Sequence, residues 1–276
     1  MVTIDSHQHF WKYNKENHSW IGDDMAVIRQ DFLPDQLRAV YQQNQVNGCV
    51  AVQADQTVEE TDFLLDLASE HDFIRGVVGW ADLQSPDIAE QLANYRQFKK
   101  LKGFRHILQG EAQRDLCLQK SFLNGISLLE RHGFAYDILI LKDQLQYIPE
   151  LVSAFPNQRF VIDHLAKPTI KDGKIRDWKR DIELVALHDN VHCKVSGMVT
   201  EADLQRWRTE DFTPYLDVVV EAFGVKRLMF GSDWPVCLAA GNYMQVINIV
   251  RSYFNSFSEY EKSLVFGANA IDFYQL

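Results

Sequence analysis

Residues 2–10 of the chain, VTIDSHQHF, join a short apolar run to a polar tip that carries two histidines. The run Val2–Ile4 has the composition of a buried β-strand, and the tip DSHQHF contains no glycine. An open, doubly wound nucleotide-binding sheet normally has a glycine-rich phosphate loop directly after its first strand. The stretch therefore argues against that fold and favours another α/β arrangement.

The same sequence pattern recurs along the whole chain. Eight apolar runs, each followed by a polar tip, predict strands at Val2–Ile4, Gly48–Val52, Gly76–Gly79, Leu101–Phe104, Phe134–Tyr136, Arg159–Ile162, Val191–Val195 and Arg227–Phe230. Helical periodicity lies between them and after the last, at Leu33–Gln43, Val58–Glu70, Ser85–Phe98, Gln119–Arg131, Leu141–Phe155, Trp178–Leu187, Phe212–Phe223 and Tyr243–Asn255. This alternation predicts parallel strands that close into a (β/α)8 TIM barrel, as a single domain over residues 1–276.

The overall composition limits the classes of function. With 46% hydrophobic residues, the 276-residue chain can bury a large core, and its net charge of −10 argues against nucleic acid as a partner. The four cysteines are scattered and form no CxxC pair, which favours reduced, buried thiols. We find no signal-peptide pattern and no apolar run near ~18 residues, so we expect a cytoplasmic protein without membrane association.

In a (β/α)8 barrel the chemistry lies at the C-terminal ends of the strands. Ionisable side chains are concentrated at those tips in this sequence, and burying them is unfavourable unless they find partners. The tips contain His7, His9, Asp82, Arg105, His106, Asp137, His164, Lys194 and Asp233.

The histidine pair at the first tip is a candidate metal site. Side chains alternate along a strand, so His7 and His9 share a face, and the same rule places Asp5 with them. Neutral imidazoles bind divalent zinc well. An isolated HxH is nevertheless weak evidence, since most such pairs are surface or packing histidines.

Two later tips strengthen this interpretation. His164 follows the sixth predicted strand, and Asp233 follows the eighth, which lies beside the first in a closed barrel. A carboxylate there could bind a metal, act as a general base toward water, or do both. The alternative is that Asp233 only caps a turn in Ser-Asp-Trp-Pro.

The tips DSHQHFW, GWADL, GFRH, DHLAKP and FGSDWPV together resemble the amidohydrolase superfamily, and within it the sugar-lactone hydrolases. The resemblance runs from Asp5 to about Asn269 and implies a distorted (β/α)8 barrel that hydrolyses an aldonolactone of the L-fucono or L-rhamnono type. Many members bind two metals. Here Arg105-His106 ends the fourth strand, and Asp137 stands where a fifth-strand histidine is expected, so the resemblance implies one divalent metal, zinc, or metal-free catalysis.

The resemblance and the strand pattern together give a set of site residues. We expect Asp233, His164 and Arg105 to be catalytic, with Asp233 as the base, and His7, His9, His164 and Asp233 to bind the metal. Arg105 and His106 should face opposite ways, and Arg105 could instead pair with a structural carboxylate. The expected substrate-binding residues are Gln53, Trp80, Asp82, His106 and Trp234.

Further expectations concern neighbouring residues and other functions. Trp11 and Trp20 are candidate pocket walls, and Lys194 is expected to pair with Asp163 or Asp233. The alternative functions are a metal-dependent decarboxylase of the same superfamily and, less favoured, a protein that binds a sugar acid without converting it.

Overall fold

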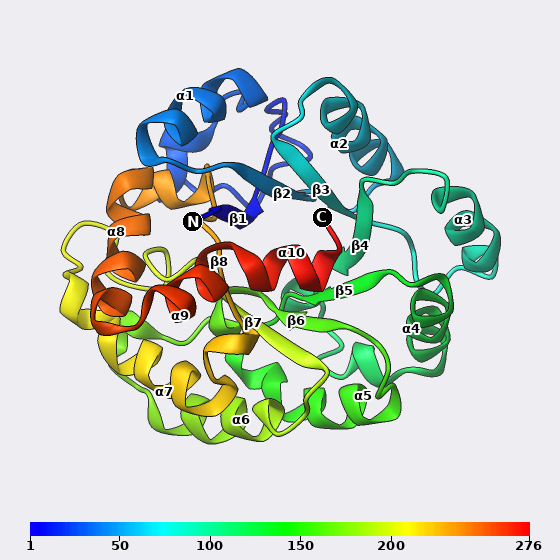
Figure 1. Cartoon of the computed structure of the whole chain (residues 1–276). Coiled ribbons are helices and arrows are strands. Elements are labelled where there is room, and N and C mark those ends of the chain that lie inside the picture. Colours follow the sequence, from blue (N-terminus) through cyan, green and yellow to red (C-terminus); the bar gives the residue numbers. More distant parts are fainter.

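The computed structural model describes residues 1–276 and confirms the (β/α)8 barrel (Figure 1). Its eight strands are parallel and follow one another around the sheet in chain order. They are β1 (Ile4–Gln8), β2 (Gly48–Val52), β3 (Ile74–Gly79), β4 (Leu101–His106), β5 (Ala135–Ile138), β6 (Phe160–Ile162), β7 (Val191–Val195) and β8 (Leu228–Phe230). Each strand overlaps a predicted apolar run, and most differ from it only at the ends. The exception is β1, which extends beyond its predicted run to Gln8, inside the histidine tip.

The barrel closes where the segment after β8 meets β1. The Asp233 amide donates to the His7 carbonyl at 2.8 Å, and the His9 amide donates to the Trp234 carbonyl at 2.7 Å. These two bonds continue the ladder past the last residue of β8. They fix the tip that carries Asp233 next to the tip that carries the histidines.

Helices surround the barrel on its outside (Figure 1). They are α1 (Pro34–Asn44), α2 (Val58–Glu70), α3 (Ile88–Tyr95), α4 (Lys120–His132), α5 (Ile148–Ala154), α6 (Arg176–Ala186), α7 (Thr213–Phe223), α8 (Tyr243–Tyr253), α9 (Glu259–Ser263) and α10 (Asn269–Tyr274). The single helix predicted over Leu141–Phe155 was wrong: a 3-10 segment, Lys142–Tyr147, precedes α5. Pro149 lacks an N–H, which is tolerated only in the first turn of an α-helix, and α5 accordingly begins at Ile148 with proline in its first turn. No helix of the structure has the length and apolar character needed to cross a membrane.

The core has two parts. A large apolar layer lies between strands and helices, and a smaller one fills the inside of the barrel, where Ile4, Val50, Val161 and Met229 meet. Figure 1 shows α10 crossing the end of the barrel at which both chain termini lie. Its buried residues complete the inner core, so this end is filled and the opposite, C-terminal end is left for the site.

One expectation about β1 was wrong. Asp5 does not share a face with His7, because the register between β1 and β2 shifts between Asp5 and Gln8. The Asp5 carboxylate instead accepts hydrogen bonds from Tyr41 of α1 and Tyr243 of α8, each at 3.0 Å. The irregularity changes the alternation, so Asp5 points to the helix layer while His7 points into the barrel.

Candidate active site

A cavity of about 350 Å³ lies at the C-terminal ends of the strands. Five of the residues singled out from the sequence line it, namely His9, Trp20, Arg105, His164 and Asp233. Other lining residues include Met25, Leu139, Lys167, Glu201 and Val236. The cavity lining therefore combines ionisable and apolar side chains.

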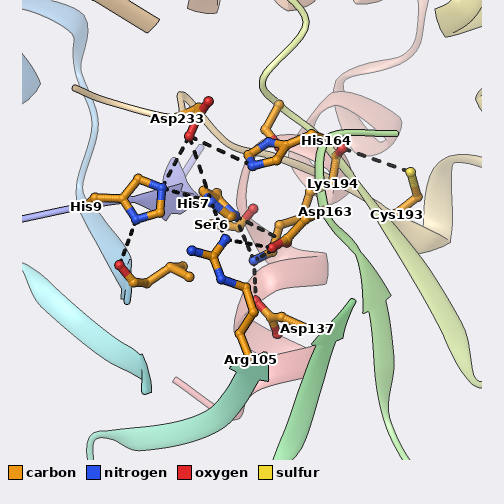
Figure 2. A network of polar contacts seen from close by, with 12 residues as sticks. Ser6, His7, His9, Arg105, Asp137, Asp163, His164, Cys193, Lys194 and Asp233 are labelled. Atoms are coloured by element: carbon orange, nitrogen blue, oxygen red, sulfur yellow. Dashed lines mark hydrogen bonds and ion pairs between the residues drawn. The ribbon is translucent and has the colours of Figure 1, made fainter. Parts of the chain in front are cut away.

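Three histidines and one aspartate converge beside this cavity (Figure 2). His7 Nε2 lies 3.2 Å from His9 Nε2, and His9 Nε2 lies 3.2 Å from Asp233 Oδ1. His7 Nε2 and His164 Nε2 are each 3.9 Å from the same oxygen. The structure thus brings together the four residues expected to bind a metal.

Each imidazole is oriented by a partner of its other nitrogen. His9 Nδ1 donates to the Val52 carbonyl at 2.7 Å, and His164 Nδ1 lies 2.9 Å from the Ser196 hydroxyl. His7 Nδ1 lies 3.2 Å from Asp163 Oδ1. With these partners, the Nε2 atoms of all three rings face the same space and can present lone pairs to it. His7 Nε2 also lies 3.3 Å from Arg105 Nη1.

Burial keeps two of these rings neutral. It lowers the pKa of His7 well below its usual range and lowers the pKa of His164 to about 4. Burial alone would raise the pKa of Asp233, but His164, the hydrogen bond from His9 and nearby Lys167 together lower it. At neutral pH the cluster therefore holds uncharged His7 and His164 rings next to a carboxylate.

This donor set fits a divalent metal ion. Two imidazole lone pairs at 3.2 Å repel each other unless a cation or a proton lies between them. Ligand atoms bound tetrahedrally at ~2.0–2.1 Å lie roughly 3.3 Å apart, close to the 3.2–3.9 Å separations found here. The groups that contact the Nδ1 atoms, from Val52, Asp163 and Ser196, are of the kind that orient metal-binding histidines.

The loop after β6 positions His164 by an unusual backbone. His164, Leu165, Ala166 and Lys167 have φ values of 53°, 54°, 56° and 50°, so four consecutive non-glycine residues are left-handed. Each such residue costs roughly 1–2 kcal/mol, which the surrounding structure must offset. The turn brings both His164 and Lys167 to the cavity.

Gly197, after β7, makes room for His164. A Cβ atom added there would overlap the His164 ring, and the glycine has a φ of 62°. Both the space and the backbone therefore require glycine at this position.

Arg105 and His106 point to opposite sides of β4, as the strand period predicts. Arg105 Nη1 donates to Asp163 Oδ2 at 3.0 Å and lies 3.3 Å from His7 Nε2, while Nη2 donates to both the carbonyl and the side chain of Gln53. Arg105 thus lines the cavity and also pairs with a buried carboxylate, so both interpretations of this residue describe its position.

The remaining predicted substrate-binding residues lie away from the cavity lining. Trp80 Nε1 donates to His106 Nδ1 at 3.5 Å, and His106 Nε2 lies 2.8 Å from Glu111 Oε1. Asp82 accepts the Gln84 amide at 3.0 Å in a turn. Trp234 packs at ring-centroid distances of 6.1 and 5.1 Å from Phe10 and Phe32, and Trp11 is likewise buried in the core.

Sequence reasoning missed some features of the site. Lys194 pairs with Asp163, as expected, and not with Asp233, but it also pairs with Asp137, which was not expected. Lys167 and Glu201 form a cavity-side ion pair at 3.7 Å. A signal for Lys167 was its place in DHLAKP, the charged loop that follows a predicted strand.

Comparison with known proteins identifies the family of this chain. The amidohydrolase family model matches residues 4–276. The chain belongs to the amidohydrolase family. L-fucono-1,5-lactonase from Burkholderia multivorans is 39% identical over 286 residues, which cover 100% of this chain and 96% of the relative. The enzyme of the same name from Burkholderia ambifaria is 37% identical, over 87% of this chain and 82% of the relative.

Among solved structures, a Burkholderia multivorans amidohydrolase with bound zinc has 38% sequence identity to this amidohydrolase and a TM-score of 0.97. The match covers 100% of both chains. The likeness therefore extends over the whole barrel and its loops.

Proposed function

We propose that this amidohydrolase hydrolyses the ring ester of an aldonolactone, with L-fucono-1,5-lactone as the first candidate substrate. The observation that carries the proposal is the position of Asp233, whose carboxylate lies on the cavity among three imidazoles. The two full-length relatives named L-fucono-1,5-lactonase support the choice of substrate.

Asp233 acts as the general base in this proposal. Its lowered pKa keeps it ionised at neutral pH, so it can accept a proton from water as the water oxygen attacks the lactone carbonyl carbon. The carbonyl carbon–ring oxygen bond then breaks, and the proton passes from Asp233 to the departing ring oxygen. The product is the open hydroxy acid, which ionises and releases one proton to the medium.

Positive charge and donors must stabilise the developing oxyanion. Arg105 provides a fixed charge at the cavity, held in place by Asp163 and Gln53. His7, His9, His164 and Asp233 would hold the metal, for which we propose zinc because the donors are nitrogen and oxygen and the solved Burkholderia relative contains zinc. When bound, the ion supplies positive charge next to the carbonyl oxygen.

The cavity wall supplies contacts for the rest of the sugar. Trp20 is 42% exposed and packs edge-on against Trp11 at 5.9 Å, so its ring is held in place while it faces the cavity. We assign Lys167 and Glu201 to the sugar hydroxyls, because they form an ion pair that lines the same cavity. Gln53, Trp80, Asp82, His106 and Trp234 then support the site from behind the lining.

A proton-release assay with a pH indicator tests the proposal. The protein is offered L-fucono-1,5-lactone, L-rhamnono-1,4-lactone and D-galactono-1,4-lactone, with and without a chelator, and spontaneous hydrolysis is subtracted. Acid release from the 6-deoxy lactones supports the proposal. No release from any lactone overturns it, and carbon dioxide release from an aromatic carboxylic acid would instead indicate the decarboxylase.

A further inference from the structure

Lys194 is a fully buried cation directly behind the candidate metal site. Its side chain has 0% exposure, and Nζ lies 2.5 Å from Asp137 Oδ2, 3.0 Å from Asp163 Oδ1 and 3.1 Å from His7 Nδ1. Figure 2 shows it among these groups, on the side of the cluster away from Asp233. The two nitrogens of the His7 ring therefore lie in two different environments: Nδ1 faces Lys194 and Asp163, and Nε2 faces the candidate metal site.

The groups around Lys194 are themselves of the kind that bind metals. One ligand atom each of His7, Asp137 and Asp163 lie within 4.8 Å of one another, and the same holds for His7, His164 and Asp233. Two adjacent clusters that share His7 have the layout of two neighbouring ion positions, one at each nitrogen of the shared imidazole. Here the centre of the second cluster is filled by an ammonium group.

The charges in the second cluster are already matched. The Tyr274 hydroxyl donates its one proton to the Asp137 carboxylate, whose oxygens lie 2.8 and 2.9 Å away, and Asp163 is paired with Arg105 at 3.0 Å. Two carboxylates thus meet two cations in a space without solvent. Buried carboxylates without such partners would be strongly destabilising.

We propose that the Lys194 ammonium takes the place of a second metal ion and restricts the site to one metal. The ammonium lies 3.0 Å from Asp163 Oδ1 and holds this oxygen against His7 Nδ1, so that His7 Nε2 is the nitrogen that faces the first ion. It also occupies the space that a second ion would need. The inference concerns only how many ions the site holds, and it does not depend on which substrate the protein uses.

Removing the side chain should open the second position. The oxygen atoms of Asp137 and Asp163 suit Mn²⁺, a cation that carboxylates bind well. In Lys194→Ala we expect two equivalents of Mn²⁺ per chain after gel filtration, by elemental analysis, where the wild type retains one. We also expect Mn²⁺ to raise the Tm of Lys194→Ala by several degrees more than that of the wild type.

Two further variants test whether the second ion binds at the position vacated by the Lys194 side chain or whether the substitution only loosens the surrounding structure. Lys194→Met removes the charge but fills the same space, so it should keep one equivalent. Lys194→Ala combined with Asp137→Asn should return from two equivalents to one, because the second cluster has lost a carboxylate. Electron paramagnetic resonance of bound Mn²⁺ should show coupling between two ions only in Lys194→Ala.

Several results would overturn the inference. These are two equivalents in the wild type, one equivalent in folded Lys194→Ala, or two in Lys194→Met. Should Lys194→Ala not fold in metal-free buffer, its refolding yield against Mn²⁺ concentration becomes the readout. Recovery with Mn²⁺ supports the inference, and no recovery at any concentration contradicts it.

Discussion

His9 Nε2 and Asp233 Oδ1 lie 3.2 Å apart although 224 residues separate them in the chain. The contact crosses the seam that closes the barrel, where backbone hydrogen bonds join the segment after β8 to β1. Closure of the barrel and assembly of the site are therefore the same structural event. A change that loosened this seam would separate the carboxylate from the imidazoles.

Asp233→Asn should lower kcat by about 10²–10⁴, because an amide cannot accept the proton from water. Asp233 has a φ of 57°, a left-handed conformation that asparagine tolerates, so the backbone should keep its shape. The measurement is the rate of lactone-dependent proton release at saturating substrate. Circular dichroism of both proteins checks that the fold is retained.

Turnover of Asp233→Asn within a few-fold of the wild type would exclude Asp233 as the base. Its metal content should be measured on the same sample. If the variant lost both the ion and the activity, the result would not separate the role of Asp233 as a base from its role as a metal ligand. Adding zinc until the content is restored, while activity stays low, then isolates the role as base.

Ser196→Ala should weaken metal binding about 10–100-fold, because the hydroxyl that orients His164 through Nδ1 is lost. Competition with a fluorescent chelator gives the Kd. Ser6→Ala is the matched control, since Ser6 is also buried beside the site but donates to the Phe230 carbonyl. Equal metal affinity in the two variants would show that Ser196 does not orient the ligand.

Much of the fold follows from local sequence. Strands buried on both faces read as apolar runs, which is why Gly48–Val52 and Val191–Val195 were predicted at their observed bounds. The alternation of side chains along a strand also predicted correctly that Arg105 and His106 point to opposite sides of β4. The placement of His164 and Asp233 near His7 needed only the rule that parallel strands present their C-terminal ends together.

Other features depend on contacts that a pattern does not contain. The irregularity in β1 that turns Asp5 away from His7 has no glycine or proline to mark it. The left-handed turn His164–Lys167 also lacks glycine, and only tertiary contacts can hold it. Lys194 meets Asp137 across the inside of the barrel, from strands that are not neighbours, so the choice among its carboxylate partners required the closed structure.

Trp20→Ala should raise KM roughly 10-fold with little change in kcat, because the ring lines the cavity and packs against Trp11 rather than against a ring of the His–Asp cluster. Trp20→Phe keeps an aromatic wall and should recover most of the affinity. Initial rates over a range of lactone concentrations separate the two constants. A fall in kcat at unchanged KM would contradict the assignment of Trp20 to the wall.

Glu60 offers a pH-dependent test of stability away from the cluster. It lies in the first turn of α2, and its carboxylate accepts the Ala54 amide at 2.9 Å in the loop after β2. Burial, with a contribution from the charge of Asp55, raises the pKa of Glu60 from 4.5 to about 7. Between these values the folded chain holds a proton that the unfolded chain releases, so this residue's contribution to stability falls as pH rises.

Glu60→Gln should therefore become more stable relative to the wild type as pH rises from 5 to 8. The amide oxygen can still accept the Ala54 N–H, and the variant avoids a buried charge whose cost is on the order of 2 kcal/mol above pH 7. Thermal unfolding at several pH values gives the difference in Tm. Glu59→Gln removes the same charge from an exposed position one residue away and serves as the control. A Tm difference for Glu60→Gln that stays constant, or shrinks as pH rises, would refute the raised pKa.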